Sequence, residues 1–382
     1  MTALPRGFRA HVANIGIKDD TTDFAVIVAD EPCTASAVFT KSRFAGPSVT
    51  ISREHVADGS LQAVAVVSKN ANVATGPDGH ADAVALAEGV AEAVGCTTDA
   101  VLIASTGVIG RRYPIDKVRT HLASMPTPDL DEADPVAEAI MTTDTHPKTA
   151  SASVGDATVV GVAKGVGMIE PDMATMLAFV LTDADVPLPE LDQRFRAVVD
   201  RTFNCVSVDT DTSTSDTAAI LASGQAGAVD LDLFEAALES VCLDLTRQLA
   251  SDGEGAETLI VVTVDSARDD AQAKRVAKTI VNSPLVKTAV HGADPNWGRI
   301  AMAIGKCSDD TDIDPDRVVI RIGEQELFPA PADDAALADL ERYLAGDEVL
   351  IHVSLQISTG TSTVYGCDLT DGYVRINADY TT

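Results

Sequence analysis

The residues best suited to chemistry lie in the segment 163–183, where a glycine-rich loop and a tight Pro171-Asp172 turn lead into an apolar strand. Thr175 stands at the mouth of that strand, which is predicted over Met176–Thr182. Most threonines at the start of a strand have no chemical role, and in this structural interpretation the loop only leads into a buried strand. In the functional interpretation the loop strains the Ala174–Thr175 peptide bond and the Thr175 hydroxyl attacks the carbonyl carbon of Ala174. The acyl group moves from nitrogen to oxygen, and water then hydrolyses the ester.

Self-cleavage would give Thr175 a free α-amine, whose ordinary pKa is about 7.7–8.0. This amine is the nearest base for the Thr175 hydroxyl, so the nucleophile and its base would belong to one residue. The sequence therefore predicts an α chain, residues 1–174, and a β chain, residues 175–382, of 174 and 208 residues. The two chains are expected to fold together.

The segment resembles the cleavage region of the ornithine acetyltransferase family, which includes the bifunctional glutamate N-acetyltransferases. The matching residues there are Lys164-Gly-Val-Gly-Met-Ile169 and Met173-Ala-Thr-Met-Leu177. Further matches follow in order along nearly the whole chain, and their number carries the resemblance. They are Lys69–Asn72, Ser105–Gly110, Met141–Lys148, Thr212–Thr217, Asp252–Ala256, Gly292–Arg299, Tyr365–Thr370 and Ile376–Thr382.

The resemblance implies a ping-pong acetyltransferase of arginine biosynthesis. N2-acetylornithine would acetylate Thr175, ornithine would leave, and glutamate would take the acetyl group to give N-acetylglutamate. Some members of the family also accept acetyl-CoA, and the sequence leaves both kinds open. A threonine ester needs no metal ion and no bound cofactor. The resemblance also implies a mature enzyme of two α and two β chains.

The resemblance assigns roles to residues outside the cleavage segment as well. It places the oxyanion hole at Thr106 and Gly107, because a hydroxyl and a backbone N–H are the donors that a tetrahedral oxyanion needs. Without the family resemblance, these two residues would be interpreted as the exit from a strand. Lys164 would be interpreted as a solvated surface charge and Glu254 as an acidic residue of a loop. The implied substrate contacts are Thr142 or Thr143, Lys164, Thr175, Glu254, Asn377 and Thr382.

Chemically, this set suits an amino-acid substrate. The lysine, the hydroxyls and the amide can bind a carboxylate, while Glu254 suits the cationic side chain of ornithine. Which of the two adjacent threonines contacts substrate stays open. Glu170 and Asp172 stand where less acidic residues are expected. They are either substitutions on an acidic surface or a brake on cleavage, through negative charge beside the incipient oxyanion.

Strand-like runs alternate with amphipathic helices in a mixed order, which favours layered α/β structure with substantial antiparallel sheet. With the resemblance, the expected fold is an α-β-β-α-type sandwich with a second, smaller α/β domain. The predicted helices are His80–Gly95, Leu231–Ala250, Lys274–Val281 and Ala335–Leu344. Besides Met176–Thr182, the predicted strands are Phe24–Asp30, Gln62–Ser68, Ala100–Thr106, Thr258–Val264, Val318–Ile322, Val349–Ile357 and Tyr373–Ile376.

The charge balance is strongly acidic, with 58 acidic and 28 basic residues and a net charge of −30. Such a surface is a poor partner for nucleic acid or an anionic membrane. Charge spread over both halves of the chain favours an intracellular protein of a salt-loving organism, with folding that depends on molar salt. The six cysteines form no C-x-x-C pair, and no secretory signal or membrane-spanning run is present. A cytoplasmic location is therefore expected.

Two other functions stay open at this point. A self-processing amidase or aminopeptidase of a related fold would use water as the final acceptor. A non-catalytic binding protein for acidic or amino-acid ligands would stay intact. Turnover with and without glutamate separates the first from an acetyltransferase, and the intact mass of the chain tests the second.

Overall fold

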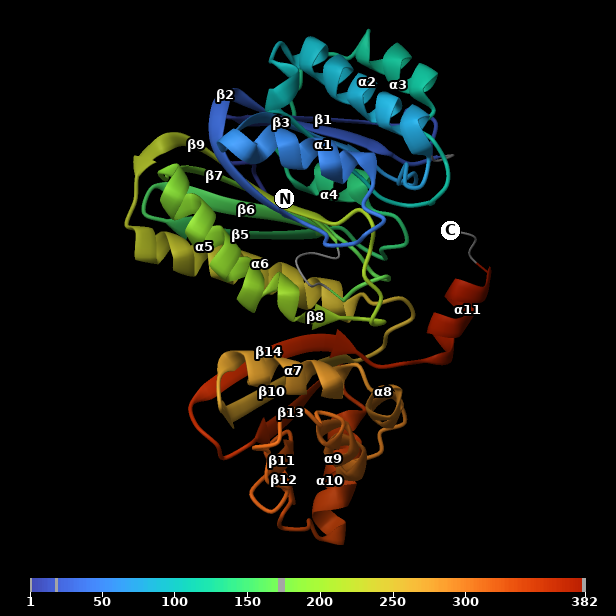
Figure 1. Cartoon of the computed structure of the whole chain (residues 1–382), viewed down its shortest axis with the longest axis vertical. Coiled ribbons are helices and arrows are strands. Elements are labelled where there is room, and N and C mark those ends of the chain that lie inside the picture. Colours follow the sequence, from blue (N-terminus) through green and yellow to red (C-terminus); the bar gives the residue numbers. More distant parts are fainter. Residues whose placement is uncertain (1, 18–19, 171–175, 380–382) are drawn as a thin grey trace.

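The computed structural model describes residues 2–17, 20–170 and 176–379. The described part contains two β-sheets, each in its own domain (Figure 1). The larger sheet has the strand order β4-β3-β2-β9-β7-β6-β5, and β1 pairs with β2 beside this path. Its strands are β1 Phe8–Ala13, β2 Phe24–Phe39, β3 Ser60–Val67, β4 Val101–Ser105, β5 Lys148–Val154, β6 Ala157–Lys164, β7 Leu177–Asp185 and β9 Thr217–Ala228.

The long strand β2 takes part in both halves of the larger sheet, and the sheet folds into two layers that face each other (Figure 1). Three apolar cores lie between successive layers of helices and strands. One core packs the outer helices α2 (Gly76–Val94) and α3 (Ile115–Leu122) on β1–β4. A second core lies between the two β layers. The third packs α5 (Leu188–Arg201) and α6 (Leu231–Ser251) on the other layer. The predicted α-β-β-α sandwich is confirmed.

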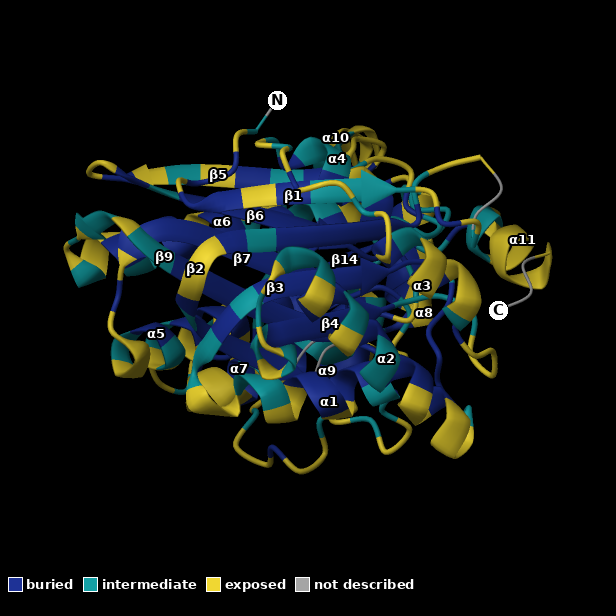
Figure 2. Cartoon of the chain, turned by 90° about the horizontal axis from the view of Figure 1, so that it is seen from above, coloured by how far each residue is buried: buried dark blue, intermediate teal, exposed yellow. Residues whose placement is uncertain are grey.

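Two short helices, α1 (Pro47–His55) and α4 (Asp134–Ile140), contribute to the inner core between the layers. Strands β4, β6 and β7 are almost entirely buried, as the dark blue ribbon in Figure 2 shows, whereas β1 and β5 carry exposed and half-buried residues. Alanine, valine, leucine and isoleucine supply most of this interior. The small aromatic content of the sequence is therefore sufficient for a large core.

Strand β7 occupies an inner position of the larger sheet. It pairs antiparallel with β6 on one side and parallel with β9 on the other, with Leu177 opposite both Lys164 and Thr217. The residues before β7 in sequence supply β1–β6, whereas β7 and β9 lie between β2 and β6. The parts of the chain before residue 171 and after residue 175 therefore share one sheet.

The second domain contains a six-stranded sheet of order β12-β11-β13-β10-β14-β8 and its own apolar core. Helices α7, α8, α9 and α10 pack against this sheet. Helix α11 follows its last long strand and returns toward the larger domain (Figure 1). The elements are β8 Val206–Ser207, β10 Leu259–Ala267, α7 Asp270–Val281, α8 Pro284–His291, α9 Trp297–Gly305, β11 Val319–Ile322, β12 Gln325–Phe328, α10 Asp334–Leu344, β13 Glu348–Ser354, β14 Gly360–Cys367 and α11 Asp371–Asp379.

The four predicted helices are confirmed as parts of α2, α6, α7 and α10. Gly95 ends α2 with a left-handed φ of 79°, as a glycine after a helix should. The strand predicted over Phe24–Asp30 continues to Phe39, because a bulge between Val28 and Cys33 accommodates Pro32.

The strand predicted over Tyr373–Ile376 is wrong, because these residues belong to helix α11. The Thr370 hydroxyl accepts hydrogen bonds from the backbone N–H of Gly372 at 3.0 Å and Tyr373 at 3.4 Å. These bonds satisfy N–H groups at the start of the helix. Arg375 and Asp371, four residues apart, then form an ion pair.

No helix of the described residues is long and apolar enough to cross a membrane.

Two histidines near the first β layer predict how stability depends on pH. The Nε2 atoms of His11 and His121 lie 3.0 Å apart and the rings stack. Burial lowers the pKa of both groups, and the neighbouring imidazole lowers that of His11 further. The unfolded chain, with histidine pKa values of about 6.5, therefore binds more protons than the native state. The stability that the two neutral histidines contribute is therefore present above about pH 6.5 and is lost as the pH falls below that value.

We therefore expect the urea concentration at the midpoint of unfolding to decrease when the pH is lowered from 7.5 to 5.5. The decrease should be smaller in His121→Gln. The matched control is His80→Gln, which replaces an exposed histidine on α2. An equal pH dependence in the two variants would contradict the assignment to this pair.

Candidate active site

One pocket between the β layers and the second domain gathers all the described residues that the sequence predicted for the site. Its lining includes Met176, the neighbour of Thr175 in the chain. The predicted residues in the lining are Thr106, Gly107, Thr142, Thr143, Lys164, Glu254 and Asn377. These residues come from segments up to 271 positions apart in sequence (Thr106 to Asn377). The predicted site residues Ala174, Thr175 and Thr382 lie outside the described residues.

Thr106 and Gly107 follow strand β4 at the edge of the pocket. The backbone of the neighbouring segment holds this loop, since Thr106 N–H donates to the carbonyl of Val67 and Val108 N–H donates to that of Lys69. Gly107 has φ = 124°, and a Cβ atom there would lie 2.3 Å from the carbonyl carbon of Lys69. Only glycine fits this position. The loop is therefore fixed at the edge of the pocket.

Lys164 ends strand β6 and is 7% exposed. Its Nζ donates to the Thr106 hydroxyl oxygen at 3.3 Å. That contact leaves the Thr106 hydroxyl proton free to be donated elsewhere. Burial lowers the pKa of Lys164, and the Lys148 ammonium adds to this, against the carboxylates of three acidic neighbours. A cation of this kind, held out of water, suits a substrate carboxylate.

Glu254 links two further predicted residues. Its Oε1 accepts from the Thr143 hydroxyl at 3.0 Å, and its Oε2 accepts from the Asn377 side-chain amide at 2.8 Å. A Cβ atom on Gly167 would lie 2.6 Å from Glu254 Oε2, so the carboxylate packs directly on that glycine. The carboxylate is thus held at the pocket wall by groups from three segments.

The two adjacent threonines differ in their contacts. The Thr143 hydroxyl donates to Glu254, whereas the backbone N–H of Thr142 donates to Asp144 Oδ2 at 3.0 Å. The Thr142 carbonyl accepts from Lys69 Nζ. Both threonines line the pocket.

Several pocket residues were not predicted as functional. Asp216 lines the pocket and is 2% exposed, and among the described residues its Oδ2 has no hydrogen-bond partner. Burial raises the pKa of Asp216 well above its ordinary value. The Thr212–Thr217 match contains Asp216, but nothing in its spacing indicates that strand β9 brings the residue beside Met176.

Glu170 does not line the pocket. Its Oε2 accepts from the Asn282 side-chain amide at 2.8 Å, and its Oε1 lies 3.8 Å from Lys278 Nζ at the end of α7. Its charge is therefore partly balanced by the second domain. Asp172, the other unexpected acidic residue, lies outside the described residues.

The Gly292–Arg299 match lies in the second domain and contributes nothing to the pocket lining. The Asn296 side chain caps helix α9 through the N–H of Arg299, and Trp297 stacks on Phe328 with ring centroids 5.2 Å apart. The segment therefore contains the start of helix α9.

One group of described residues could hold a metal ion, namely Glu257, His291 and Asp368, whose ligand atoms lie within 4.8 Å of one another. Asp368 Oδ1 already accepts from the backbone N–H groups of Glu257 and Thr258. The histidine spacing in the sequence did not indicate this group, which lies outside the pocket lining.

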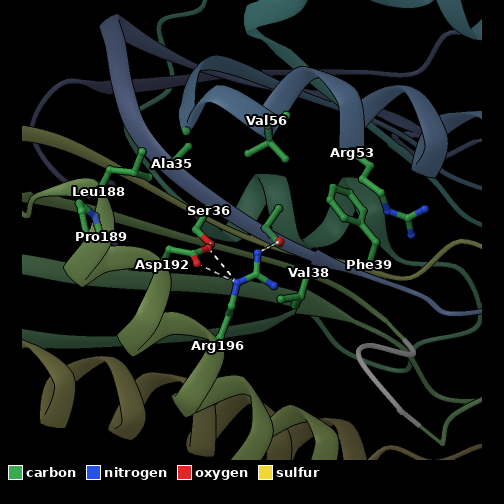
Figure 3. Close-up of a pocket in the computed structure, with 13 residues that line it drawn as sticks. Ala35, Ser36, Val38, Phe39, Arg53, Val56, Leu188, Pro189, Asp192 and Arg196 are labelled. Carbon is green, nitrogen blue, oxygen red and sulfur yellow. Dashed lines mark hydrogen bonds and ion pairs between the residues drawn. The ribbon is translucent and has the colours of Figure 1, made fainter.

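A second, open pocket of about 610 Å³ lies between β2, α1 and α5 (Figure 3). It contains none of the predicted residues. Arg196 forms an ion pair with Asp192 at 2.9 Å and donates to the carbonyl of Ala37 at 3.3 Å. Asp192 accepts from the Ser36 hydroxyl at 2.6 Å. Because these polar groups satisfy one another, the smaller pocket around Lys164 is the better candidate for chemistry.

That candidate site combines the Thr106 hydroxyl and the Gly107 backbone N–H with the buried ammonium of Lys164 and the carboxylate of Glu254. This set can bind an amino acid at both its charged ends and stabilise a tetrahedral intermediate between them. Together with the layered fold, it defines an acyl-transfer site that handles small charged substrates.

Comparisons with known proteins agree with this description. The profile of the ArgJ family matches residues 9–382. Glutamate N-acetyltransferase Oat2 of Streptomyces clavuligerus is 59% identical, over 99% of this chain and 98% of its own length. Arginine biosynthesis bifunctional protein ArgJ 2 of Nostoc sp. is 55% identical, over 100% of this chain and 99% of its own length. The chain belongs to the ArgJ family.

A solved structure is also similar. The crystal structure of arginine biosynthesis bifunctional protein argJ from Bacillus halodurans matches with a TM-score of 0.50 and 42% identity. The match covers 53% of this chain and 98% of the crystallised chain. The family resemblance of the sequence is thus confirmed.

Proposed function

We propose that this chain transfers the acetyl group of N2-acetylornithine to glutamate through an acetyl-Thr175 intermediate, giving ornithine and N-acetylglutamate. The observation that carries the proposal is the single pocket that gathers seven predicted residues with Met176. Family membership over residues 9–382 supports the same activity.

In the proposed reaction the Thr175 hydroxyl attacks the acetyl carbonyl carbon. The Thr175 α-amine takes the hydroxyl proton, and the Thr106 hydroxyl and Gly107 N–H donate to the oxyanion. The tetrahedral intermediate collapses, the C–N bond breaks, and ornithine leaves with a proton on its α-amine. Glutamate then attacks the ester through its own α-amine and regenerates the free threonine.

The remaining residues of the pocket would bind the substrates. Lys164 suits the substrate carboxylate, and Glu254 suits the side-chain ammonium of ornithine. Thr142, Thr143, Asn377 and Thr382 would complete the contacts. Because Thr143 and Asn377 already donate to Glu254, they would fix the orientation of its carboxylate for the cation.

The nucleophile requires cleavage of the Ala174–Thr175 bond, which would divide the chain into an α chain, 1–174, and a β chain, 175–382. The crystallised relative from Bacillus halodurans supports this division. Nearly all of that chain is matched by about half of this one, as expected for a chain of half the length.

The mature protein would be a cytoplasmic assembly of two α and two β chains. Acetyl-CoA would serve as a second acetyl donor if this member is bifunctional, as the names of the relatives from Nostoc sp. and Bacillus halodurans say of those proteins. The net charge of −30 favours a requirement for high salt.

The test is turnover of N2-acetylornithine with and without glutamate, followed by release of ornithine, acetate and N-acetylglutamate. We expect N-acetylglutamate in amounts equal to the ornithine released, and little acetate. Equal acetate release in the absence of glutamate would identify a hydrolase instead. An intact chain without turnover would favour a binding protein.

Replacement of Glu254 tests the cation site. Glu254→Gln keeps the size of the side chain but removes its charge and leaves one acceptor oxygen for two donors. We expect the KM for N2-acetylornithine to rise by about tenfold, since a hydrogen bond to a charged group is worth roughly 1.5–3 kcal/mol. Steady-state kinetics measure this.

The matched control for that variant is Glu257→Gln, three residues further along, whose side chain is 70% exposed. Its KM should equal that of the wild type. A KM that is unchanged in Glu254→Gln as well would remove Glu254 from substrate binding.

A further inference from the structure

A fully buried lysine stands behind the pocket wall. Lys148 begins strand β5, and its side chain has no exposed surface. Its Nζ donates to Asp144 Oδ1 at 2.9 Å and to Asp252 Oδ2 at 2.5 Å. Both carboxylates are also buried, with side-chain exposures of 0% and 3%. We call Asp144, Lys148 and Asp252 the buried charge cluster.

The carboxylate oxygens of the cluster also accept hydrogen bonds from backbone N–H groups in or next to the pocket residues. Asp144 accepts from the N–H of Thr142 at 3.0 Å and from that of Gly165 at 2.7 Å. Asp252 accepts from the N–H of Thr145 at 3.1 Å and from the Thr145 hydroxyl. The cluster therefore ties segment 142–148 to the end of β6 and to the end of α6.

Each of these three segments carries a predicted substrate residue. Thr143 precedes Asp144, Lys164 precedes Gly165, and Glu254 follows Asp252 by two positions. Glu254 N–H also donates to the carbonyl of Val166 at 2.8 Å. The hydrogen bond between Thr143 and Glu254 thus closes a ring of contacts whose other side is the buried charge cluster.

The lysines around Asp144 favour its charged form in spite of its burial. Burial would raise the pKa of Asp144, but the ammonium groups of Lys164 and Lys148 outweigh it and lower the pKa below its ordinary value. A buried ion pair by itself contributes little or nothing to net stability, because desolvation offsets the attraction. Its location behind the pocket therefore calls for another explanation than stability.

We infer that the buried charge cluster positions Thr143 and Glu254 for substrate, so that Asp144, Lys148 and Asp252 act as positioning residues for the cation of ornithine. The inference rests on the proposed function. The backbone hydrogen bonds that hold the Thr106–Gly107 loop go to Val67 and Lys69 and do not involve the cluster. Disturbing Asp252 should therefore weaken substrate binding more than the chemical step.

The test is Asp252→Asn in the full chain. Asparagine keeps the size of the side chain but removes the negative charge that faces the Lys148 ammonium. Its NH₂ group would also replace one of the two carboxylate oxygens that accept hydrogen bonds from Lys148 and Thr145. We expect the KM for N2-acetylornithine and the dissociation constant of ornithine to rise by about tenfold, as for a displaced binding group. We expect a much smaller change in kcat.

The matched control is Asp310→Asn in the second domain. Asp310 is likewise buried and accepts from Arg268 at 3.0 Å and Arg275 at 2.6 Å, far from the pocket lining. Both variants should lower the midpoint of thermal unfolding. Only Asp252→Asn should weaken ornithine binding, and equal effects of the two variants on binding would overturn the inference.

A second variant covers the case in which Asp252→Asn does not fold. Thr145→Val removes the exposed hydroxyl that donates to Asp252 and keeps every charge. Calorimetric titration with ornithine should show weaker binding than wild type, and unchanged binding would overturn the inference. If wild type itself binds no ornithine, the proposed function fails first. If wild type binds and the variants bind equally well, the positioning role alone fails.

Discussion

Thr175→Ala is expected to leave a single chain of 382 residues where the wild type gives fragments of 174 and 208 residues. The variant lacks the hydroxyl that would attack the carbonyl carbon of Ala174. The same hydroxyl would accept the acetyl group in the transfer reaction. We expect acetyl transfer to fall by at least about 10³-fold, since removing a nucleophile leaves only binding and oxyanion stabilisation. Intact-mass analysis and the transfer assay measure the two losses on the same sample.

The control for Thr175→Ala is Thr175→Ser, which keeps a hydroxyl and should still cleave and retain measurable transfer. A brief reaction of the wild type with N2-acetylornithine should add about 42 Da to the 208-residue fragment, the mass of an acetyl group. Cleavage at the same bond in Thr175→Ala would refute the assignment of the nucleophile.

Thr106→Val is expected to lower kcat by about 10²–10³-fold, the usual cost of losing one oxyanion donor. Valine has nearly the size of threonine, so the loop held by Val67 and Lys69 should persist. The KM for N2-acetylornithine should change little, because the donor acts on the transition state rather than on the bound substrate. Steady-state kinetics on the cleaved protein, verified by mass, measure the effect.

The same substitution on the surface of helix α7 provides the control. Thr279 is half-buried there, outside the pocket lining, and donates to the carbonyl of Arg275 at 2.8 Å, so Thr279→Val should leave kcat unchanged. A kcat for Thr106→Val within a few-fold of the wild type would show that the hydroxyl is not an oxyanion donor.

The sequence predicted the elements with strong periodicity and missed those that tertiary contacts determine. Helix α6 repeats apolar residues over almost six turns, and its bounds were predicted to within one residue. Helix α11 has no buried residue at all, so no periodicity marks it, and its β-branched and aromatic residues indicated a strand. The cap by Thr370, the ion pair between Asp371 and Arg375 and the contact between Asn377 and Glu254 explain the helix.

For the site, family motifs indicated which residues gather but not how they are supported. Lys164 and Glu254 were predicted from matched motifs, and the structure places both on one pocket. Lys148 and Asp216 belong to matched motifs too, but spacing cannot distinguish a buried charge from a solvated one. Their burial depends on strand pairing between segments far apart in the chain, which a single sequence does not specify.

The inner position of β7 has a consequence for how the protein must be made. After the proposed cleavage, β7 and β9 of the second fragment would lie between β2 and β6 of the first, with hydrogen bonds to both. Two fragments synthesised from separate genes would keep unpaired strand edges until they met, because β2 and β6 are joined in the sheet only through β9 and β7. This is a barrier to assembly. A precursor in one piece avoids that barrier, because all strands pair before the break occurs. Under the proposed cleavage, synthesis as a single precursor would favour assembly, and the Ala174–Thr175 peptide bond would serve as a temporary tether that folding makes dispensable.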